Sequence, residues 1–451
     1  MKLRNSIIAL ATLILSLVLV QTVTAEQASR KFGETDRFSW GGDIRIRGTR
    51  IDRNTFSPDG AIPSGPDVQW LRVRTRLWMD YALSDKIRFD LRLAHRWHHV
   101  SSHFLDPNNQ DTTTWRFPDE VIFDQLKITV DDVGGLPLRL TIGRQDLILG
   151  RGMIVLEGTA YDQGRGIYFD GLRGTWQQGN TTVDLFGFYS SKTDDFIVIN
   201  DRNRLLRRGD TLLTGIYWTE KINPAFNTDL YYMYNQIRDD FVVIGDGVRD
   251  DVRLHITGGR IFGKPHDLID YSAEFAVQRG KLRQTDRDMK GMMSDLRLGF
   301  LLPGNLPFSP KLNLQYTWMR GEDKTANTYK GWHPVAAEYP IWREELMPIA
   351  NRGNWTNLHN YRLEAILQLH DKVRWTNAGS LLRADTVAGY NDPFGNPRQG
   401  KTMGQLYSSF LDYSATKKWT LRLEAALLKP GSYYASDNSA HWLRLESYYR
   451  F

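Results

Sequence analysis

Hydrophobic and polar side chains alternate one by one along most of this chain, and the segment Leu71–Trp97 is the strongest example. In its first half, LRVRTRLWMDYAL, every second residue is apolar apart from Thr75, and the positions between them carry mostly arginine or aspartate. After the short turn LSDK the alternation resumes from Ile87. Strict alternation is the signature of a β-strand whose two faces meet different environments. The segment therefore predicts two consecutive strands, each with an apolar face and a charged face.

The same alternation recurs down the chain and predicts about eighteen strands of roughly nine to twelve residues, the length that a tilted strand needs to cross a bilayer. Ile269–Gln278 is the clearest of them. Thr182–Tyr189 is less clear because Phe186 and Phe188 make its second face apolar as well, and Val252–Phe262 is glycine-rich and ambiguous in phase. The pattern predicts an all-β protein built as one antiparallel up-and-down sheet.

The connections between the predicted strands are short and long in turn. Turns such as LSDK, QGN and HDK alternate with longer segments, of which Arg320–Thr356 is the longest. Short periplasmic turns that alternate with long extracellular loops are typical of transmembrane barrels of the bacterial outer membrane. An even number of strands would place both termini on the short-turn, periplasmic side.

The cost of placing charge in lipid decides which face points outward. An arginine on the lipid-facing side at the bilayer midplane costs about 2–4 kcal/mol. Arg72, Arg74 and Arg76 share one face of a single strand, so together they would cost roughly 6–12 kcal/mol, which is comparable to the whole stability of an ordinary domain. We therefore expect the apolar face to meet lipid and the arginines to line the lumen.

The N-terminus has the order of a secretory signal peptide. Lys2 and Arg4 precede an apolar run from Ile7 to Val20, and small residues lead up to Ala25. We expect cleavage after Ala25, which divides the chain into a signal peptide, 1–25, and a single barrel domain, 26–451. After residue 25 no apolar stretch approaches the roughly twenty residues that a membrane-spanning helix needs, so the sequence excludes a helical membrane protein.

The amino-acid composition excludes further classes of protein. Without Lys2 and Arg4 the chain keeps 56 basic and 52 acidic residues, a net charge of about +4. This balance is not that of a nucleic-acid-binding protein, which would carry a strongly basic domain. The chain has no cysteine, so it has no disulfide framework.

Aromatic and histidine residues add two smaller predictions. Tryptophans near strand ends are typical of the aromatic belts at membrane interfaces, and the candidates are Trp40, Trp176, Trp318, Trp375, Trp419 and Trp442. HRWHHVSSH, residues 95–103, has four histidines but no carboxylate or thiolate partner for a metal ion. We interpret it as a polar external loop and predict no metal site, no other cofactor and no catalytic group.

One segment resembles a known family. GRQDLILGRGMIVLEGTAYDQGRGIYFDGLRGTW, residues 143–176, is similar to the alginate-export family of outer-membrane proteins. The resemblance lies in the Gly-Arg-Gln that ends one strand, the long loop after it, and the Phe169–Arg173 segment that opens the next strand. The C-terminal Phe451, in register with Leu443, Leu445 and Tyr449, is similar to the terminal signal read by the outer-membrane assembly machinery.

The resemblance implies an eighteen-stranded barrel that passes an anionic uronic-acid polysaccharide through an arginine-rich lumen. Guanidinium groups are always charged and suit bidentate contacts with carboxylates. Thirteen cations on the charged strand faces are the candidate substrate track: Arg45, Arg47, Arg72, Arg74, Arg76, Arg88, Arg92, Lys127, Arg144, Arg297, Arg362, Arg422 and Arg444. The same cations could instead pair with lumen carboxylates and stiffen the wall, and the candidates for this pairing are Asp80, Asp90, Asp295, Glu364, Glu424 and Glu446.

Three functions stay open at this point. The first is a passive exporter of an acidic exopolysaccharide such as alginate, and the second is a general anion porin or an uptake channel for small acidic solutes and oligosaccharides. The third, an outer-membrane enzyme or adhesin, lacks a catalytic cluster or an extended binding loop. We expect a monomer in the outer membrane with lipid and lipopolysaccharide around it, periplasmic export partners, and no nucleic acid as a partner.

Overall fold

The computed structural model describes residues 37–52, 68–101, 113–116, 121–157, 169–193, 197–199, 209–238, 251–302, 306–337, 356–391, 397–398, 400–434 and 439–451. The predicted signal peptide, 1–25, lies outside the described residues. In the part of the chain that is described, no helix is long and apolar enough to cross a membrane.

Eighteen antiparallel strands form the wall of a closed barrel. They are β1 (Phe38–Asp52), β2 (Val68–Ala82), β3 (Ile87–Ser101), β5 (Val121–Val130), β6 (Leu138–Gln145), β9 (Phe169–Gln178), β10 (Thr181–Ser190), β12 (Asp210–Asn223), β13 (Phe226–Arg238), β14 (Val252–His266), β15 (Ile269–Leu282), β17 (Met292–Leu301), β18 (Lys311–Met319), β19 (Leu358–His370), β20 (Val373–Arg383), β21 (Thr402–Ser414), β22 (Trp419–Pro430) and β23 (Ala440–Arg450).

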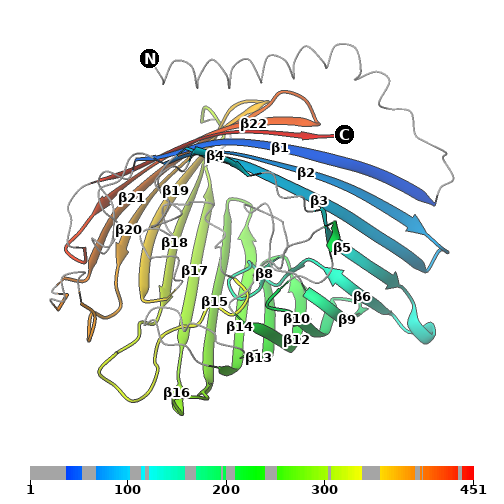
Figure 1. Cartoon of the computed structure of the whole chain (residues 1–451), viewed down its shortest axis with the longest axis horizontal. Coiled ribbons are helices and arrows are strands. Elements are labelled where there is room, and N and C mark those ends of the chain that lie inside the picture. Colours follow the sequence, from blue (N-terminus) through cyan, green and yellow to red (C-terminus); the bar gives the residue numbers. More distant parts are fainter. Residues whose placement is uncertain are drawn as a thin grey trace.

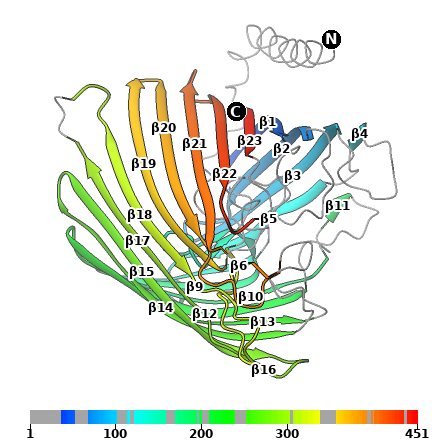
Figure 2. The same cartoon turned by 90° about the vertical axis from the view of Figure 1, so that its left-hand side faces the viewer.

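Each wall strand pairs with the next in sequence, and β23 pairs with β1 to close the ring. Figures 1 and 2 show the strands running round in chain order as one continuous wall. Three short strands extend it at the long-loop end, namely β4 (Thr113–Arg116) on β3, β11 (Ile197–Ile199) on β5 and β16 (Arg287–Met289) on β15. A single 3₁₀ turn, η1 (Val133–Gly135), lies between β5 and β6. Closure leaves no unpaired sheet edge, which a strand wall in lipid requires.

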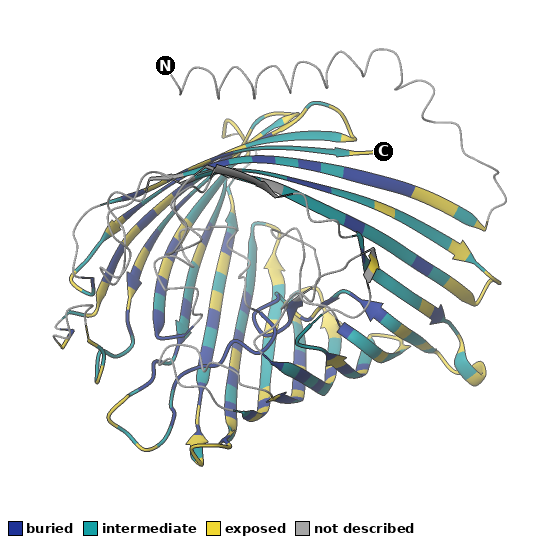
Figure 3. Ribbon diagram, in the orientation of Figure 1, coloured by how far each residue is buried: buried dark blue, intermediate teal, exposed yellow. Residues whose placement is uncertain are grey.

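The two faces of the wall differ as the alternation predicts. Buried and exposed positions follow each other along the wall strands (Figure 3). Large apolar side chains such as Leu185, Leu363 and Leu443 are about half exposed on the outer face, whereas Asp43 and Arg74 are buried on the inner face. The prediction of an apolar outside and a charged inside is confirmed for these strands.

Part of the inner face is apolar instead. Phe186 and Phe188 on β10, and Leu254 and Ile256 on β14, point inward and are buried in one hydrophobic cluster. Residues from two long connections belong to the same cluster. Packing of these connections against the inside of the wall explains why the sequence was ambiguous in phase at 182–189 and 252–262.

Two smaller predictions were wrong. Trp442 was assigned to an aromatic belt, but it lies on the inner phase of β23, is buried, and has the Arg444 guanidinium over its ring at 4.8 Å. The histidine-rich segment was interpreted as a loop, but β3 continues to Ser101, so His95 and His99 belong to a strand. The β3–β2 ladder, in which Ser101 pairs with Gln69, extends this strand beyond the point where the apolar alternation ends.

Charge placement on β19 tests the facing of the wall. Leu363→Arg puts a guanidinium on the outer face and should lower the free energy of unfolding in vesicles by about 2–4 kcal/mol. Ile366→Arg is the matched control, because Ile366 lies three residues further on the opposite face. Urea unfolding and the heat-modifiable gel mobility of the folded barrel measure both variants. Equal losses in the two variants would contradict the assignment.

Candidate pore and its inner loops

A β-hairpin from the connection between β6 and β9 folds into the barrel, and we call its residues 147–157 the tongue (Figure 1). Its arms are β7 (Leu147–Ile148) and β8 (Leu156–Glu157), which pair antiparallel. The N–H of Gly152 donates to the carbonyl of Leu149 at 2.9 Å and closes the turn at the tip. Six apolar side chains of the tongue are buried in the cluster on the inner wall, namely Leu147, Leu149, Met153, Ile154, Val155 and Leu156.

The tip of the tongue is fixed to a distant part of the wall. Arg151 Nη1 donates to Asp295 Oδ2 on β17 at 2.8 Å, and β9, β10, β12, β13, β14 and β15 separate β6 from β17 in the ring. Asp295 is fully buried and accepts further hydrogen bonds from Gln315 and Thr317 at 2.8 and 2.7 Å. The wall donors bind Oδ1, whereas Oδ2 receives the guanidinium of the tongue.

Glycine at position 150 permits this close approach. Gly150 has a left-handed φ of 57°, which L-residues with side chains rarely adopt. A Cβ atom there would lie 2.8 Å from the Tyr217 hydroxyl of the wall. The tip can therefore lie against β12 only with glycine at this position.

A second connection, between β18 and β19, also enters the lumen, and we call its residues 329–337 the inner loop. Ala336 accepts from Leu156 N–H at 2.9 Å and donates to the Ile154 carbonyl at 3.2 Å, so the backbones of the inner loop and the tongue are joined. The side-chain amide of Gln278 on β15 donates to the His333 carbonyl and accepts from its N–H, at 2.7 and 2.9 Å. Tongue, inner loop and wall form one packed unit.

Glu322 anchors the start of the same connection. Its carboxylate is almost fully buried and accepts from Arg287 Nη2 at 2.6 Å, and from the N–H groups of Lys330 and Gly331 at 2.6 and 3.2 Å. Burial raises the pKa of Glu322, although these three donors act in the opposite direction. The carboxylate ties β16 to the segment that leads into the inner loop.

The segments Gly143–Gln145 and Phe169–Arg173, which carry the family resemblance, meet at the base of the tongue. Gly143, Arg144 and Gln145 on β6 pair with Gly171, Asp170 and Phe169 on β9, residue for residue. Arg144 makes a bidentate ion pair with Asp170, with Nε–Oδ1 and Nη2–Oδ2 distances of 2.7 and 2.8 Å. The motif therefore fastens together the two ends of the connection that carries the tongue.

Arg144 does not share the face of the other candidate arginines. The β5–β6–β9 ladder has no register shift at this point, and Arg144 and Asp170 lie two residues from Ile142 and Leu172, which are both exposed on the outer face. Arg144 also donates to the Phe123 carbonyl at 3.0 Å. The structure therefore corrects the assignment of Arg144 to the lumen, since its partner and its phase place it on the outer side of the wall.

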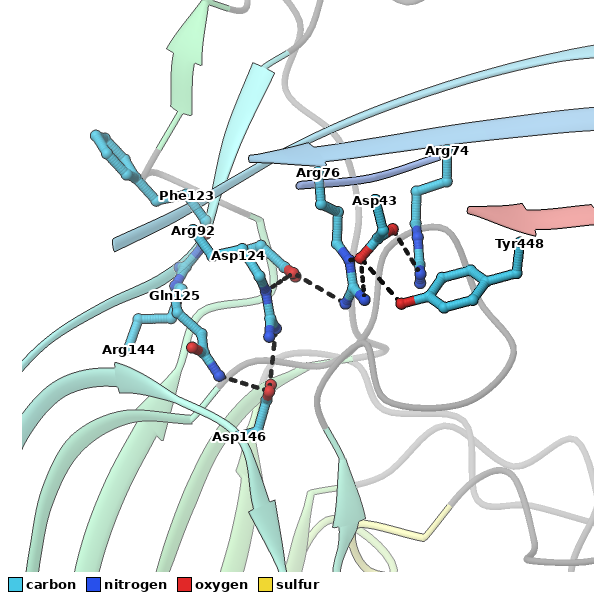
Figure 4. Close-up of polar contacts among 10 residues, drawn as sticks. All are labelled: Asp43, Arg74, Arg76, Arg92, Phe123, Asp124, Gln125, Arg144, Asp146 and Tyr448. Atoms are coloured by element: carbon cyan, nitrogen blue, oxygen red, sulfur yellow. Dashed lines mark hydrogen bonds and ion pairs between the residues drawn. The ribbon is translucent and has the colours of Figure 1, made fainter. Parts of the chain in front are cut away.

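A network of ion pairs crosses the inner face from β23 to the base of the tongue (Figure 4). Asp43 on β1 accepts from Arg74 and Arg76 on β2 at 3.2 and 2.8 Å, and from the Tyr448 hydroxyl at 3.4 Å. Arg76 also lies 3.8 Å from Asp124 of β5.

The network continues to the tongue. Asp124 pairs with Arg92 of β3, and Arg92 Nη2 donates to Asp146 at 3.0 Å. Gln125 donates to the same carboxylate at 2.6 Å. Because Asp146 directly precedes the tongue, the base of the tongue is held by the inner wall, while its tip is held by Asp295.

The thirteen predicted track residues differ strongly in exposure. Arg45, Arg47, Arg74, Arg144, Arg362 and Arg444 are nearly fully buried, Arg76 and Arg92 are slightly exposed, and Arg72, Arg88, Lys127, Arg297 and Arg422 are partly or well exposed. The predicted pairing with carboxylates is confirmed for Asp90, Glu364, Glu424 and Glu446. Asp295 pairs with Arg151 of the tongue, a residue that the sequence did not single out. The role of these cations as a substrate track stays a prediction.

Two carboxylates near the short-turn end are each shared by two cations, and we call these groups the mouth clusters. In the first, Asp270 accepts from Arg297 at 2.5 Å and from Lys311 at 2.6 Å. In the second, Asp412 accepts from Arg422 at 2.6 Å and Arg374 at 3.0 Å.

Lys311 and Arg374 of the mouth clusters were not among the predicted track residues. Both lie on the polar phase of their strands, so the alternation contained the signal that identifies them. Among the described residues, no group of three or more His, Asp or Glu side chains is placed to hold a metal ion.

One family model and several solved structures match nearly the whole chain. A family model described as alginate export matches residues 36–444. OccAB4 of Acinetobacter baumannii is 13% identical with a TM-score of 0.56, covering 92% of this chain and 98% of that one. OprD, an outer membrane protein of Pseudomonas aeruginosa, is 10% identical with a TM-score of 0.53, covering 91% and 93%. OpdK of the same organism, solved with vanillate, is 12% identical with a TM-score of 0.54, covering 92% and 98%.

No curated protein sequence matches the chain. At 10–13% identity the solved structures show the fold alone. The family model is the comparison that reaches beyond the fold, since it spans nearly the whole barrel.

The contact between Arg151 and Asp295 should set the width of the pore. Arg151→Ala removes the only described ion pair at the tip of the tongue and leaves a buried carboxylate without its cation, which is strongly destabilising. We expect the tip to leave the wall and the single-channel conductance to change or become noisy in planar bilayers. Arg139→Ala is the control, because Arg139 is exposed and pairs with Asp131. Identical conductance traces for Arg151→Ala and the wild type would contradict the role of this contact.

Proposed function

Because the chain belongs to the alginate-export family, we propose that it is a passive outer-membrane channel that exports an anionic uronic-acid polysaccharide such as alginate. Family and fold are those of outer-membrane channels and not of enzymes. The finer part of the proposal, the substrate and its path, rests on the charges of the inner face.

The observation that carries the proposal is the surplus of positive charge in the mouth clusters. In each cluster two cations share one carboxylate, Asp270 or Asp412, so one positive charge is left uncompensated within the cluster. The cations remain open to water, since the Arg374 side chain is 49% exposed and the Lys311 side chain 31%. An anion that enters from the short-turn end would meet these groups first.

The chemistry suits a polyuronate. Such a polymer carries one carboxylate per sugar, and a guanidinium binds a carboxylate through two parallel hydrogen bonds. Because each cation already contacts a carboxylate of the wall, a substrate carboxylate competes with that partner and is bound weakly. Weak binding at several sites favours conduction, which requires release as well as entry.

The buried arginines have a different role in this proposal. Arg45, Arg47, Arg74 and Arg444 are nearly inaccessible to water, so they stiffen the wall and contribute to the potential of the lumen without touching the polymer. The substrate track proposed from the sequence is thereby narrowed to the exposed members, among them Arg88, Lys127, Arg297 and Arg422.

One observation favours a second candidate, a channel for small anionic solutes. The tongue and the inner loop are packed into the lumen as one unit, and a narrowed lumen suits small solutes better than a polymer. OpdK, which shares the fold, was solved with vanillate, a small carboxylate. Entry of a polymer would require that the remaining passage admits an extended sugar chain.

The lengths of the connections suggest how the barrel is oriented in the outer membrane. Short turns on the periplasmic side and long loops outside are the arrangement of bacterial outer-membrane barrels. We propose that both termini and the mouth clusters face the periplasm, where an export machinery would deliver the polymer.

Neutralising one mouth cluster tests the role of its charge. Arg374→Ser with Arg422→Ser leaves Asp412 without cations, so anion selectivity, measured as the reversal potential in a salt gradient, should fall. Asp412→Asn removes the carboxylate and should shift selectivity in the opposite direction. Sodium alginate added on the short-turn side should block the wild-type current, and the double serine variant should need a higher concentration for the same block.

The outcomes separate the two candidates. Anion selectivity without any block by alginate would remove the exporter and leave the small-anion channel. Unchanged selectivity in both mouth-cluster variants would show that these cations are structural only. Arg139→Ser is the control for loss of one exposed charge on the same side.

Cysteine labelling tests the orientation, since the chain has no cysteine of its own. Asn327→Cys lies in a long connection, and Lys221→Cys lies beside a short turn; both side chains are exposed. A bulky impermeant maleimide should label Asn327→Cys in intact cells and Lys221→Cys only after the outer membrane is opened. The reverse pattern would invert the proposed orientation.

A further inference from the structure

Strands β13, β14 and β15 are neighbours in the wall (Figure 1). Exposed cations lie on the outer phase at their long-loop ends. They are Arg238, Arg253, Arg279 and Lys281, and we call them the cationic patch. The residues between them in sequence, such as Leu254 and Leu282, point inward and are fully buried. The patch therefore belongs to the outer surface of the barrel and not to the pore.

The register places like charges side by side. Arg253 lies directly opposite Lys281 in the β14–β15 ladder. Like charges at directly opposed positions of an antiparallel pair destabilise a sheet. An anion bound between these side chains would turn that repulsion into attraction.

The described residues compensate the charge of the patch only at Lys281, which has Asp286 beside it and Asp288 directly opposite in the β15–β16 ladder. Lys281 pairs with Asp286 at 2.8 Å, and both side chains are largely exposed. Arg279 donates to the backbone carbonyl of Gln278 at 3.0 Å, and the neighbour of Arg238 is the amide of Gln236. Among the described residues no carboxylate lies within ion-pair distance of Arg238, Arg253 or Arg279.

The depth of the patch along the strands identifies the kind of anion. Leu230 and Phe275 are exposed on the outer face at mid-strand. Nearer the long-loop end, the Tyr232 hydroxyl lies 2.7 Å from His255 Nδ1, and the Tyr234 ring lies 5.1 Å from the His255 ring. The patch follows directly beyond these rings. Apolar, aromatic and cationic groups in this order match the hydrocarbon, interface and headgroup layers of a membrane.

We propose that the cationic patch binds the phosphate groups of the phosphorylated glycolipid, lipid A, in the outer leaflet. Arginine forks suit phosphate as they suit carboxylate, and the two strands hold the cations within reach of one headgroup. The proposal rests on the orientation proposed above and is independent of what the channel transports. At the other end of the same strands the exposed Lys264 pairs with Asp267 at 3.5 Å.

Binding of lipid A by the purified full-length protein in detergent tests the patch. The variant Arg253→Ser, Arg279→Ser, Lys281→Ser is compared with a control of equal charge loss in exposed short-turn positions, Lys221→Ser, Lys264→Ser, Lys417→Ser. Diphosphoryl lipid A is titrated and the bound lipid is counted by native mass spectrometry, with monophosphoryl lipid A and inorganic phosphate as further probes. Folding of each variant is checked by heat-modifiable mobility.

We expect the wild type and the control to retain diphosphoryl lipid A, the patch variant to bind it roughly tenfold more weakly, and the monophosphoryl lipid to bind less tightly than the diphosphoryl one. Equal retention by the patch variant and the wild type would overturn the proposal, as would equal loss in the control. Competition by inorganic phosphate without retention of lipid A would show an ion site in place of a lipid site. The labelling and conductance experiments report separately on orientation and transport.

Discussion

Hydrocarbon outside the wall dictates how this protein uses charge. Because lipid can satisfy neither a backbone group nor a side-chain charge, the strands must close on themselves and turn their charges inward. Once inside, the arginines need partners, since an uncompensated buried charge costs about 3–5 kcal/mol. The network from Tyr448 through Asp43, Asp124 and Asp146 provides those partners and joins five strands to the base of the tongue. The interaction that stabilises the wall therefore also positions the loop that narrows the lumen.

The inner face carries two kinds of surface. The tongue and the inner loop pack into a hydrophobic cluster in which Met233, Leu254 and Trp332 are fully buried, and the cluster also includes Leu358, Leu406 and Leu428 at the long-loop ends of β19, β21 and β22. Toward the short-turn end the inner face is polar, and the cations of the mouth clusters stay partly open to water. The apolar contacts therefore hold the loops that fold into the barrel, while the charged groups near the short-turn end stay accessible.

The sequence predicted the hairpins, the wiring and the facing wherever one face was apolar and the other charged. It failed on β10 and β14, because loops that arrive from elsewhere in the chain make the inner face apolar and erase the contrast on which the alternation depends. The errors at Arg144 and Trp442 have another cause. The exposed neighbours Ile142 and Leu443 predict the correct phase for both residues, whereas residue type alone predicts the wrong face. Arg151 and its partner Asp295 were beyond prediction, because their contact depends on how a loop folds back.

The family motif acquires a physical meaning from the same contacts. Arg144 and Asp170 are far apart in sequence but directly opposed in the ladder, and their bidentate pair closes the base of the tongue. Gly143 has a φ of 114°, and a Cβ atom there would lie 2.2 Å from the Leu126 carbonyl oxygen, so only glycine lets β6 approach β5 at this point. Burying an ion pair on the outer side of the wall has a desolvation cost. This pair offsets that cost by holding an element that lies inside the barrel. Here that element is the tongue, whose base and tip are held by two separate ion pairs, Arg144–Asp170 and Arg151–Asp295.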